Sequence, residues 1–263
     1  MTLALTLLLA APSCATAPRD MRFAEFDGHR IAYRMLGAGE PTIVMISGLG
    51  DGMATFDDVA PELAATATVI LYDRPGYGGS APTTGPRDAE AAERELSAVL
   101  DQSGARGPYV LIGHSLGGLY AEYFAAQHPD QIAGVVLEES RPADFTHRCE
   151  DAGVTSCTLP ASMAWTLPAG GRAELASLPM TVGEVERIRT AHGKPVLVLS
   201  RPLSENPSAF DRLWSTAQRD LTARYPGARQ LVAEDGGHYL HLDQRAWFVE
   251  SVRAFINDDL AQR

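Results

Sequence analysis

The chain has 263 residues, and 45% of them are hydrophobic, which is enough for one large domain with a full core. Its 22 basic and 33 acidic residues give a formal net charge of −11. This excess of negative charge argues against nucleic acid or an anionic membrane surface as a partner.

Residues 1–19 are predicted to be a signal-like segment that lies outside the fold. Thr2–Pro12 is an apolar run too short to span a bilayer, and the small residues after it resemble a cleavage zone. We therefore expect export to the periplasm or the extracellular medium, with no integral membrane span. Cys14 is a candidate for lipid attachment, although the residues before it match a lipobox poorly. The apolar run lacks a preceding positive charge, and without a signal function the protein would be cytoplasmic.

Alternating strand and helix patterns predict an α/β fold with a mostly parallel, doubly wound sheet covered on both faces. The chain opens with an antiparallel hairpin, because Asp27-Gly28 between two strand patterns is typical of a type I′ turn. The predicted strands are Arg22–Phe26, His29–Met35, Thr42–Ile46, Val69–Tyr72, Tyr109–Ile112, Ile132–Leu137, Pro195–Ser200 and Arg229–Ala233. The predicted helices are Phe56–Ala65, Asp88–Gln102, Leu116–Gln127, Ser208–Arg224 and Asp243–Ile256.

The alternation of strands and helices stops between residues 141 and 193, where we predict a small helical cap. Short helical pieces are expected there, because helix-breaking residues interrupt the stretch at Pro160, Pro168, Gly170-Gly171 and Pro179. The cap would be inserted between a first part of the core, 20–140, and a second part, 194–263. Cys149 and Cys157 lie within it, and in an exported protein we expect them to form a local disulfide.

A Gly-x-Ser-x-Gly motif lies between a strand pattern and a helix pattern at residues 113–117. A serine on such a turn is held in a strained backbone conformation, which the flanking glycines permit because they lack Cβ atoms. The turn exposes the hydroxyl of Ser115 at the C-terminal edge of the sheet, beside a helix N-terminus that favours developing negative charge. Ser115 is therefore the candidate nucleophile.

Four segments, in this order, resemble those of α/β-hydrolase-fold proteins with a small cap: Ser47–Gly50, Asp73–Ser80, Gly113–Gly118 and Gly236–Tyr239. The resemblance implies an α/β-hydrolase fold and a serine hydrolase mechanism. In that mechanism Ser115 is the nucleophile and His238 is its general base. The backbone N–H groups of Leu49 and Leu116 are expected to form the oxyanion hole.

The acid that completes the triad is the point at which this chain departs from the commoner pattern. The usual Asp is missing from the loop Arg201–Pro207, where Glu205 is the only carboxylate. A variant of the fold places the acid after the preceding strand, and here that strand is followed by Glu138 and Glu139. Counting from the start of the strand favours Glu139, whereas counting back from the following Arg-Pro pair favours Glu138. We predict Glu139, with Glu138 and Glu205 as the alternatives.

The resemblance implies a small-molecule carboxylic ester as substrate, because this fold with a serine nucleophile is most often an esterase. Residues beside the motifs are the candidates for binding the substrate, namely Gly48, Tyr77, His114 and Tyr239. We expect neither a metal nor an organic cofactor.

Three alternative functions stay open at this point. The first is an aminopeptidase similar to proline iminopeptidases, which would need a carboxylate in the cap to hold the substrate amine, and Glu150, Asp151 and Glu174 are available. The second is a cofactor-free perhydrolase, which uses the same triad. The third is a ligand receptor of the same fold with very low turnover.

Overall fold

The computed structural model describes residues 20–157, 159, 164–188 and 193–260, so the signal-like segment 1–19 and Cys14 lie outside the described residues. The fold is built on an eight-stranded sheet with the order β1-β2-β4-β3-β5-β6-β7-β8. The strands are β1 (Arg22–Phe26), β2 (His29–Leu36), β3 (Thr42–Ile46), β4 (Thr68–Tyr72), β5 (Tyr109–His114), β6 (Ile132–Glu138), β7 (Val196–Ser200) and β8 (Arg229–Val232). The two pairings that involve β2 are antiparallel, and all the others are parallel.

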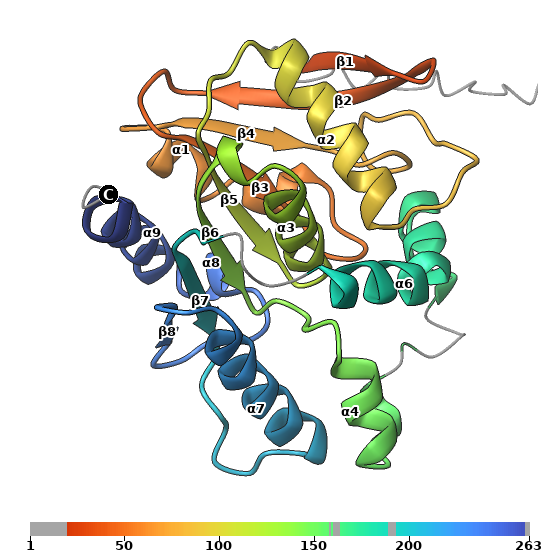
Figure 1. The fold of residues 1–263 in the computed structure, drawn as a ribbon, viewed down its shortest axis with the longest axis vertical. Helices are drawn as coiled ribbons and strands as arrows, with labels where there is room; N and C mark the ends of the chain where they lie inside the picture. The colour runs from red at the N-terminus through yellow and green to blue at the C-terminus, as the bar shows by residue number, and fades with distance from the viewer. Residues whose placement is uncertain (1–19, 158, 160–163, 189–192, 261–263) are drawn as a thin grey trace, which may run out of the picture.

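Helices cover both faces of this sheet, as the alternating pattern predicts (Figure 1). The helical elements are η1 (Met53–Phe56), α1 (Ala60–Leu63), α2 (Ala89–Ser103), α3 (Leu116–Gln127), η2 (Pro129–Gln131), α4 (Phe145–Asp151), η3 (Thr155–Cys157), α6 (Ala169–Arg187), α7 (Ala209–Arg224), α8 (Leu240–Asp243), α9 (Arg245–Ala254) and η4 (Phe255–Leu260). One core cluster joins α2, α3 and α7 to one face, and a second joins η1, α1 and α9 to the other. The protein therefore has the three-layer α/β architecture expected from the sequence.

The central strands are buried on both faces of the sheet, so both of their faces carry apolar residues. In β3, Val44 and Ile46 belong to the first core cluster, whereas Ile43 and Met45 belong to the second. Such a strand reads as a continuous apolar run rather than an alternating one. The hairpin is also present, since Asp27 and Gly28 both have positive φ, at 48° and 76°, as a type I′ turn requires.

The cap departs from the prediction of short helical pieces, because α6 is a single helix of 19 residues. Gly170 and Gly171 lie in its first turn, where they permit close packing instead of ending the helix. A Cβ atom on Gly170 would lie 2.5 Å from the carbonyl oxygen of Pro75 and 2.7 Å from the ring of Tyr77. Pro179 lies inside α6, where it removes one backbone donor without ending the helix.

The predicted helix Phe56–Ala65 is also different in the structure, where η1 and α1 occupy this stretch as two short elements. Pro61 lies in the first turn of α1, the position at which a helix tolerates a residue without an N–H group. The helix is therefore re-initiated near Pro61 instead of running through it.

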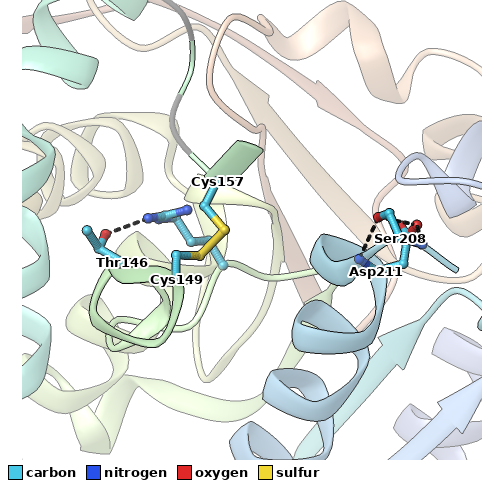
Figure 2. Close-up of a disulfide and its surroundings, with 6 residues drawn as sticks. Thr146, Cys149, Cys157, Ser208 and Asp211 are labelled. Atoms are coloured by element: carbon cyan, nitrogen blue, oxygen red, sulfur yellow. Dashed lines mark hydrogen bonds between the residues drawn. A yellow bond between two sulfur atoms is a disulfide. The ribbon is translucent and has the colours of Figure 1, made fainter. Parts of the chain in front are cut away.

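The other part of the cap is held by a disulfide and by aromatic packing. Cys149 on α4 and Cys157 on η3 are joined by a disulfide (Figure 2), with their Cα atoms 6.1 Å apart. Phe145 of α4 packs edge-on against Trp214 of α7, at 4.8 Å between ring centroids. The α4 helix is thus anchored on the core through α7, and the disulfide ties the following turn to α4.

A buried ion pair fastens α6 to the core. The guanidinium of Arg74, in the loop after β4, donates from Nε to Glu174 Oε1 at 2.5 Å and from Nη2 to Glu174 Oε2 at 3.1 Å. Both side chains are almost fully buried, with 1% and 0% of their surface exposed. Tyr77 adds a hydrogen bond from its hydroxyl to Glu174 at 2.5 Å. The cap helix is therefore positioned by a fully paired charge rather than by apolar contacts alone.

Glu174→Gln should lower the free energy of unfolding by about 3 kcal/mol or more, because it leaves the buried guanidinium of Arg74 without its counter-charge. Glu62→Gln provides the matched control, since Glu62 pairs with Arg245 at 2.5 Å on the exposed surface. There we expect a loss below about 1 kcal/mol. Urea denaturation of the two variants measures the difference. Equal losses of unfolding free energy would show that the Arg74–Glu174 pair does not hold the cap on the core.

Candidate active site

Ser115 lies on a sharp turn between β5 and α3, in a backbone conformation that few residues adopt. Its φ of 52° and ψ of −117° place it among the three non-glycine residues of the described chain with positive φ. A Cβ atom on Gly117 would lie 2.2 Å from the carbonyl oxygen of Ile46, so glycine is required there. The turn is fixed on its other side by the N–H of Ser115, which donates to the carbonyl of Glu138 at 3.1 Å.

His238 and Glu139 face each other at the C-terminal ends of the strands. Nδ1 of His238 lies 3.3 Å from Oε2 of Glu139, whose side chain is fully buried. Two further donors hold this carboxylate, the Trp214 indole N–H and the Arg201 backbone N–H, each at 2.8 Å. A carboxylate held by these donors is oriented to accept a hydrogen bond from Nδ1–H of His238, which would leave Nε2 free as a base.

The two alternative acids lie elsewhere. Glu138 is buried and bound to His241, whose Nδ1 lies 2.8 Å from Glu138 Oε1. Burial by itself would raise the pKa of the Glu138 carboxyl, but the imidazole of His241 holds that pKa below its ordinary value. Glu205 is exposed on the surface. Successive residues at a strand end point to opposite faces, which is why adjacent Glu138 and Glu139 have different histidines as partners.

His114 supports the loop that carries His238. Its Nε2 lies 2.8 Å from the backbone carbonyl of His238, and the two imidazole rings are 4.8 Å apart. Because a carbonyl can only accept, Nε2 carries the proton, and the buried Nδ1 has no hydrogen-bond partner among the described residues. Burial lowers the pKa of His114 from 6.5 to about 4, so this imidazole is neutral near pH 7.

Among the described residues, no hydrogen bond joins the hydroxyl of Ser115 to the imidazole of His238. The ring of His114, the residue before Ser115, lies 4.8 Å from the ring of His238. In ligand-free sites of this kind the hydrogen bond between serine and histidine is often long and shortens when substrate binds. A serine–histidine–glutamate triad would therefore need this bond to form with substrate.

The guanidinium of Arg74 also orients the loop that is expected to form the oxyanion hole. Its Nη1 donates to the carbonyl of Ser47 at 2.7 Å, and its Nη2 donates to the carbonyl of Gly48 at 2.9 Å. In a planar trans peptide the C=O and the following N–H point in opposite directions. Fixing the Gly48 carbonyl toward Arg74 therefore directs the N–H of Leu49 the other way. The N–H of Leu116 lies in the first turn of α3, where backbone donors are free.

A cavity of about 720 Å³ opens between Ser115 and the cap. Leu49 and Leu116 line it beside Ser115, and the residues from the cap side are Arg141, Thr146, His147, Glu150, Cys157, Leu159, Leu175, Leu178, Pro179, Val182, Gly183 and Glu186. The wall formed by α6 is mostly apolar. The cavity therefore suits a small organic molecule with its reactive group at Ser115.

The four residues predicted to bind substrate have other contacts in the structure, and among the described residues none of them lines this cavity. Tyr77 is buried between Glu174 and the N–H of Gly50. The hydroxyl of Tyr239 donates to Asp51 at 3.1 Å. Gly48 permits close packing, since a Cβ atom there would lie 2.9 Å from Nδ1 of His114. These residues support the loops of the site from behind.

Within the described chain, no group of three or more His, Cys, Asp or Glu side chains is arranged to hold a metal ion. The helices of the same described residues are too short or too polar to cross a membrane.

Several supporting residues could not be assigned from the sequence. Arg74 lies within the motif Asp73–Ser80. The motif does not reveal that its side chain binds both Glu174 of the cap and the carbonyls of Ser47 and Gly48. Trp214 lies on α7 and Glu174 on α6, far along the chain from Glu139 and Arg74, and no local pattern connects them. Arg141 follows β6, and in the sequence it helps only to align the acid of the triad.

Comparison with known proteins identifies the fold. A profile of the α/β-hydrolase fold matches residues 41–166. Over 98 residues the chain is 41% identical to a pimeloyl-[acyl-carrier protein] methyl ester esterase of Neisseria meningitidis, a match that covers 37% of this chain and 30% of that esterase. An uncharacterized protein of Mycobacterium tuberculosis is 26% identical over 92% of this chain and 82% of its own length.

Solved structures show the same fold at low sequence identity. A thermophilic esterase from Thermogutta terrifontis superposes with a TM-score of 0.70 at 20% identity, covering 91% of this chain and 99% of its own. An enol-lactonase from Burkholderia xenovorans has a TM-score of 0.69 at 21% identity, covering 90% and 100%. These likenesses establish the fold, and the site argument depends on the residues described above.

Glu139→Gln should reduce kcat for ester hydrolysis by up to ~10⁴-fold, because an amide in place of the carboxylate can stabilise the wrong tautomer of His238. Glu205→Gln is the matched control, with a kcat close to that of the parent protein. Steady-state kinetics of the two purified variants measure the contrast. A Glu139→Gln variant that keeps most of its activity would show that Glu139 is not the triad acid.

The lowered pKa of His114 predicts that the stability of the protein depends on pH. Because its pKa falls from 6.5 to about 4 on folding, the unfolded chain binds a proton in this range that the folded chain does not, and stability falls as pH drops from about 6.5 to 4. The shift corresponds to about 3 kcal/mol, at 1.36 kcal/mol per unit. His114→Gln should reduce the difference between unfolding free energies at pH 7 and pH 4.5. The control His147→Gln, at an exposed histidine, should keep it, and an unchanged difference in both variants would refute the assignment.

Proposed function

Because this protein is a member of the α/β-hydrolase-fold superfamily, we propose that it is a serine hydrolase that cleaves a small-molecule carboxylic ester through an acyl-enzyme on Ser115. The observation that carries the proposal is the placement of Ser115. Its strained turn lines a cavity of about 720 Å³, and His114, the residue before it, packs against His238, whose Nδ1 faces the buried carboxylate of Glu139. The names of the esterase relatives agree with this activity.

The proposed reaction follows from the groups at the site. Nε2 of His238 takes the proton of Ser115 as the hydroxyl attacks the ester carbonyl. The negative charge that develops on the carbonyl oxygen is stabilised by the N–H groups of Leu49 and Leu116. His238 then protonates the leaving alcohol. Water next attacks the acyl-enzyme while His238 takes its proton, and His238 returns that proton to the Ser115 oxygen as the acid is released. Glu139 stays ionised and stabilises the imidazolium.

The charges around the cavity do not favour the aminopeptidase alternative. Of the cap carboxylates, Glu174 is already bound to Arg74, and Asp151 does not line the cavity within the described chain. Glu150 and Glu186 line the cavity, but both are exposed to solvent. The charged residue on the cavity wall that follows β6 directly is Arg141, which would repel an amine. An uncharged or anionic substrate fits this cavity better.

Ser115→Ala should lower kcat on p-nitrophenyl esters by on the order of a million-fold, because the nucleophile is lost while the fold is kept. Ser204→Ala, at an exposed serine, is the control and should behave like the parent protein. Circular dichroism checks that both variants are folded.

A fluorophosphonate probe separates the remaining alternatives, since it should label Ser115 in the parent protein and fail to label Ser115→Ala. If the alanine variant keeps even a tenth of the rate, Ser115 is not the nucleophile. If Ser115 is labelled but no ester in a graded series is hydrolysed, the low-turnover receptor becomes the better description. Hydrogen peroxide as acyl acceptor tests the perhydrolase.

A further inference from the structure

The guanidinium-bearing residue Arg141 lies on the wall of the cavity, directly beside the turn that carries Ser115. Arg141 lines the cavity together with Ser115, and its backbone N–H donates to the carbonyl of Ser115 at 3.0 Å. The main chain of Arg141 is therefore fixed to the same turn that positions the proposed nucleophile. Any group that binds the guanidinium is held within the same cavity as the reacting ester.

The guanidinium of Arg141 is desolvated but has no counter-charge. Nη2 donates to the hydroxyl of Thr146 at 2.7 Å (a contact near the disulfide in Figure 2), and the guanidinium lies 5.3 Å from the centre of the Phe145 ring. Nε is buried without a hydrogen-bond partner, and within the described chain no carboxylate forms an ion pair with Arg141. Burial lowers the pKa of the guanidinium to about 10, which leaves it charged at neutral pH.

The fully buried arginines of the described chain show what the half-buried Arg141 lacks. Arg74 is paired with Glu174, and Arg87 with Glu95. A buried charge without a partner is unfavourable, so proteins normally supply a counter-charge or use the charge to bind a ligand. Arg74 and Arg87 each face a carboxylate, whereas the guanidinium of Arg141 faces the cavity.

The acidic residues of the cavity do not fill this role. Glu150 and Glu186 line it, but both are exposed to solvent, and Glu150 lies 3.5 Å from His147 on the same helix. The rest of the wall on α6 is apolar, with Leu175, Leu178 and Val182. The cavity thus combines a reactive serine, an apolar wall and one unpaired guanidinium.

We propose that Arg141 binds a carboxylate of the substrate, so that the preferred esters are those that carry a free carboxylate as well as the ester group. This inference rests on the proposed function, because it specifies the substrate class of the same site. The carboxylate can belong to the acyl part, as in a monoester of a dicarboxylic acid, or to the alcohol part, as in an O-acylated hydroxy acid. Arginine suits it, since its planar fork can hold a carboxylate with two hydrogen bonds.

Paired substrates test this preference. Monomethyl adipate is compared with methyl hexanoate for a carboxylate on the acyl side, and 4-acetoxybutyrate with butyl acetate for one on the alcohol side. We expect kcat/KM to be about ten- to a hundredfold higher for the anionic member of at least one pair, the range of a hydrogen bond to a charged group. Equal values within both pairs would overturn the proposal.

Substitutions then assign the preference to Arg141. In Arg141→Met the ratio of kcat/KM between anionic and neutral esters should fall toward one, and Arg141→Lys should restore part of it. Arg148→Met is the control, because Arg148 lies on the following helix α4, is paired with Asp144 and Asp220, and does not line the cavity, so this variant should keep the ratio. A ratio that survives in Arg141→Met would refute the assignment.

A binding measurement separates this proposal from the proposed function. Calorimetry with monomethyl adipate on Ser115→Ala, with and without Arg141→Met, needs no turnover. Binding that weakens about tenfold or more without Arg141 supports the anion site, even if no ester is hydrolysed and the proposed reaction fails. Equal binding to both proteins would overturn the anion site, whatever the hydrolysis assays show.

Discussion

The buried guanidinium of Arg74 is the interaction on which the site and the cap both depend. One side chain donates to two carbonyls of the oxyanion loop and to both oxygens of Glu174 on α6. Burying this charge is unfavourable unless all of its donors are satisfied, and here the loop and the cap satisfy them together. The direction of the Leu49 N–H and the position of the cap helix therefore share one cause. A change that moves α6 would also disturb the N–H of Leu49, the expected donor of the oxyanion hole.

The parallel pairing of β5 with β6 brings the other groups together. Gly113 pairs with Leu137 and His114 with Glu138, so the residues that follow, Ser115 and Glu139, leave the sheet side by side. Both adopt positive φ, at 52° and 43°. Two strained residues at adjacent strand ends are typical of a functional site, because the surrounding structure must hold them there. Beneath them, Glu138 and His241 form a second buried pair that supports the loops.

Sequence reasoning succeeded where the determinants are local and failed where they are not. The hairpin, the strands and the serine turn follow from short apolar runs and glycine positions, which are properties of neighbouring residues. Strand register favoured Glu139 over Glu138, and Glu139 is the carboxylate that the structure places beside His238. The cap helix is not apparent in the sequence because Pro179 and the glycine pair at its start normally break helices. The close contact with the loop after β4 explains the glycine pair. The pairing of Arg74 with a residue 100 positions away has no local signature.

The disulfide between Cys149 and Cys157 has a consequence for the chemistry of the cavity, since Cys157 forms part of its wall. Ser115 and the proposed triad lie on the core, whereas the bond lies wholly within the cap. In material made in a reducing cytosol, Ser115 would then face an altered wall. Such a preparation would react with small probes at the serine yet discriminate poorly among substrates. The redox history of a sample therefore becomes a determinant of its apparent selectivity.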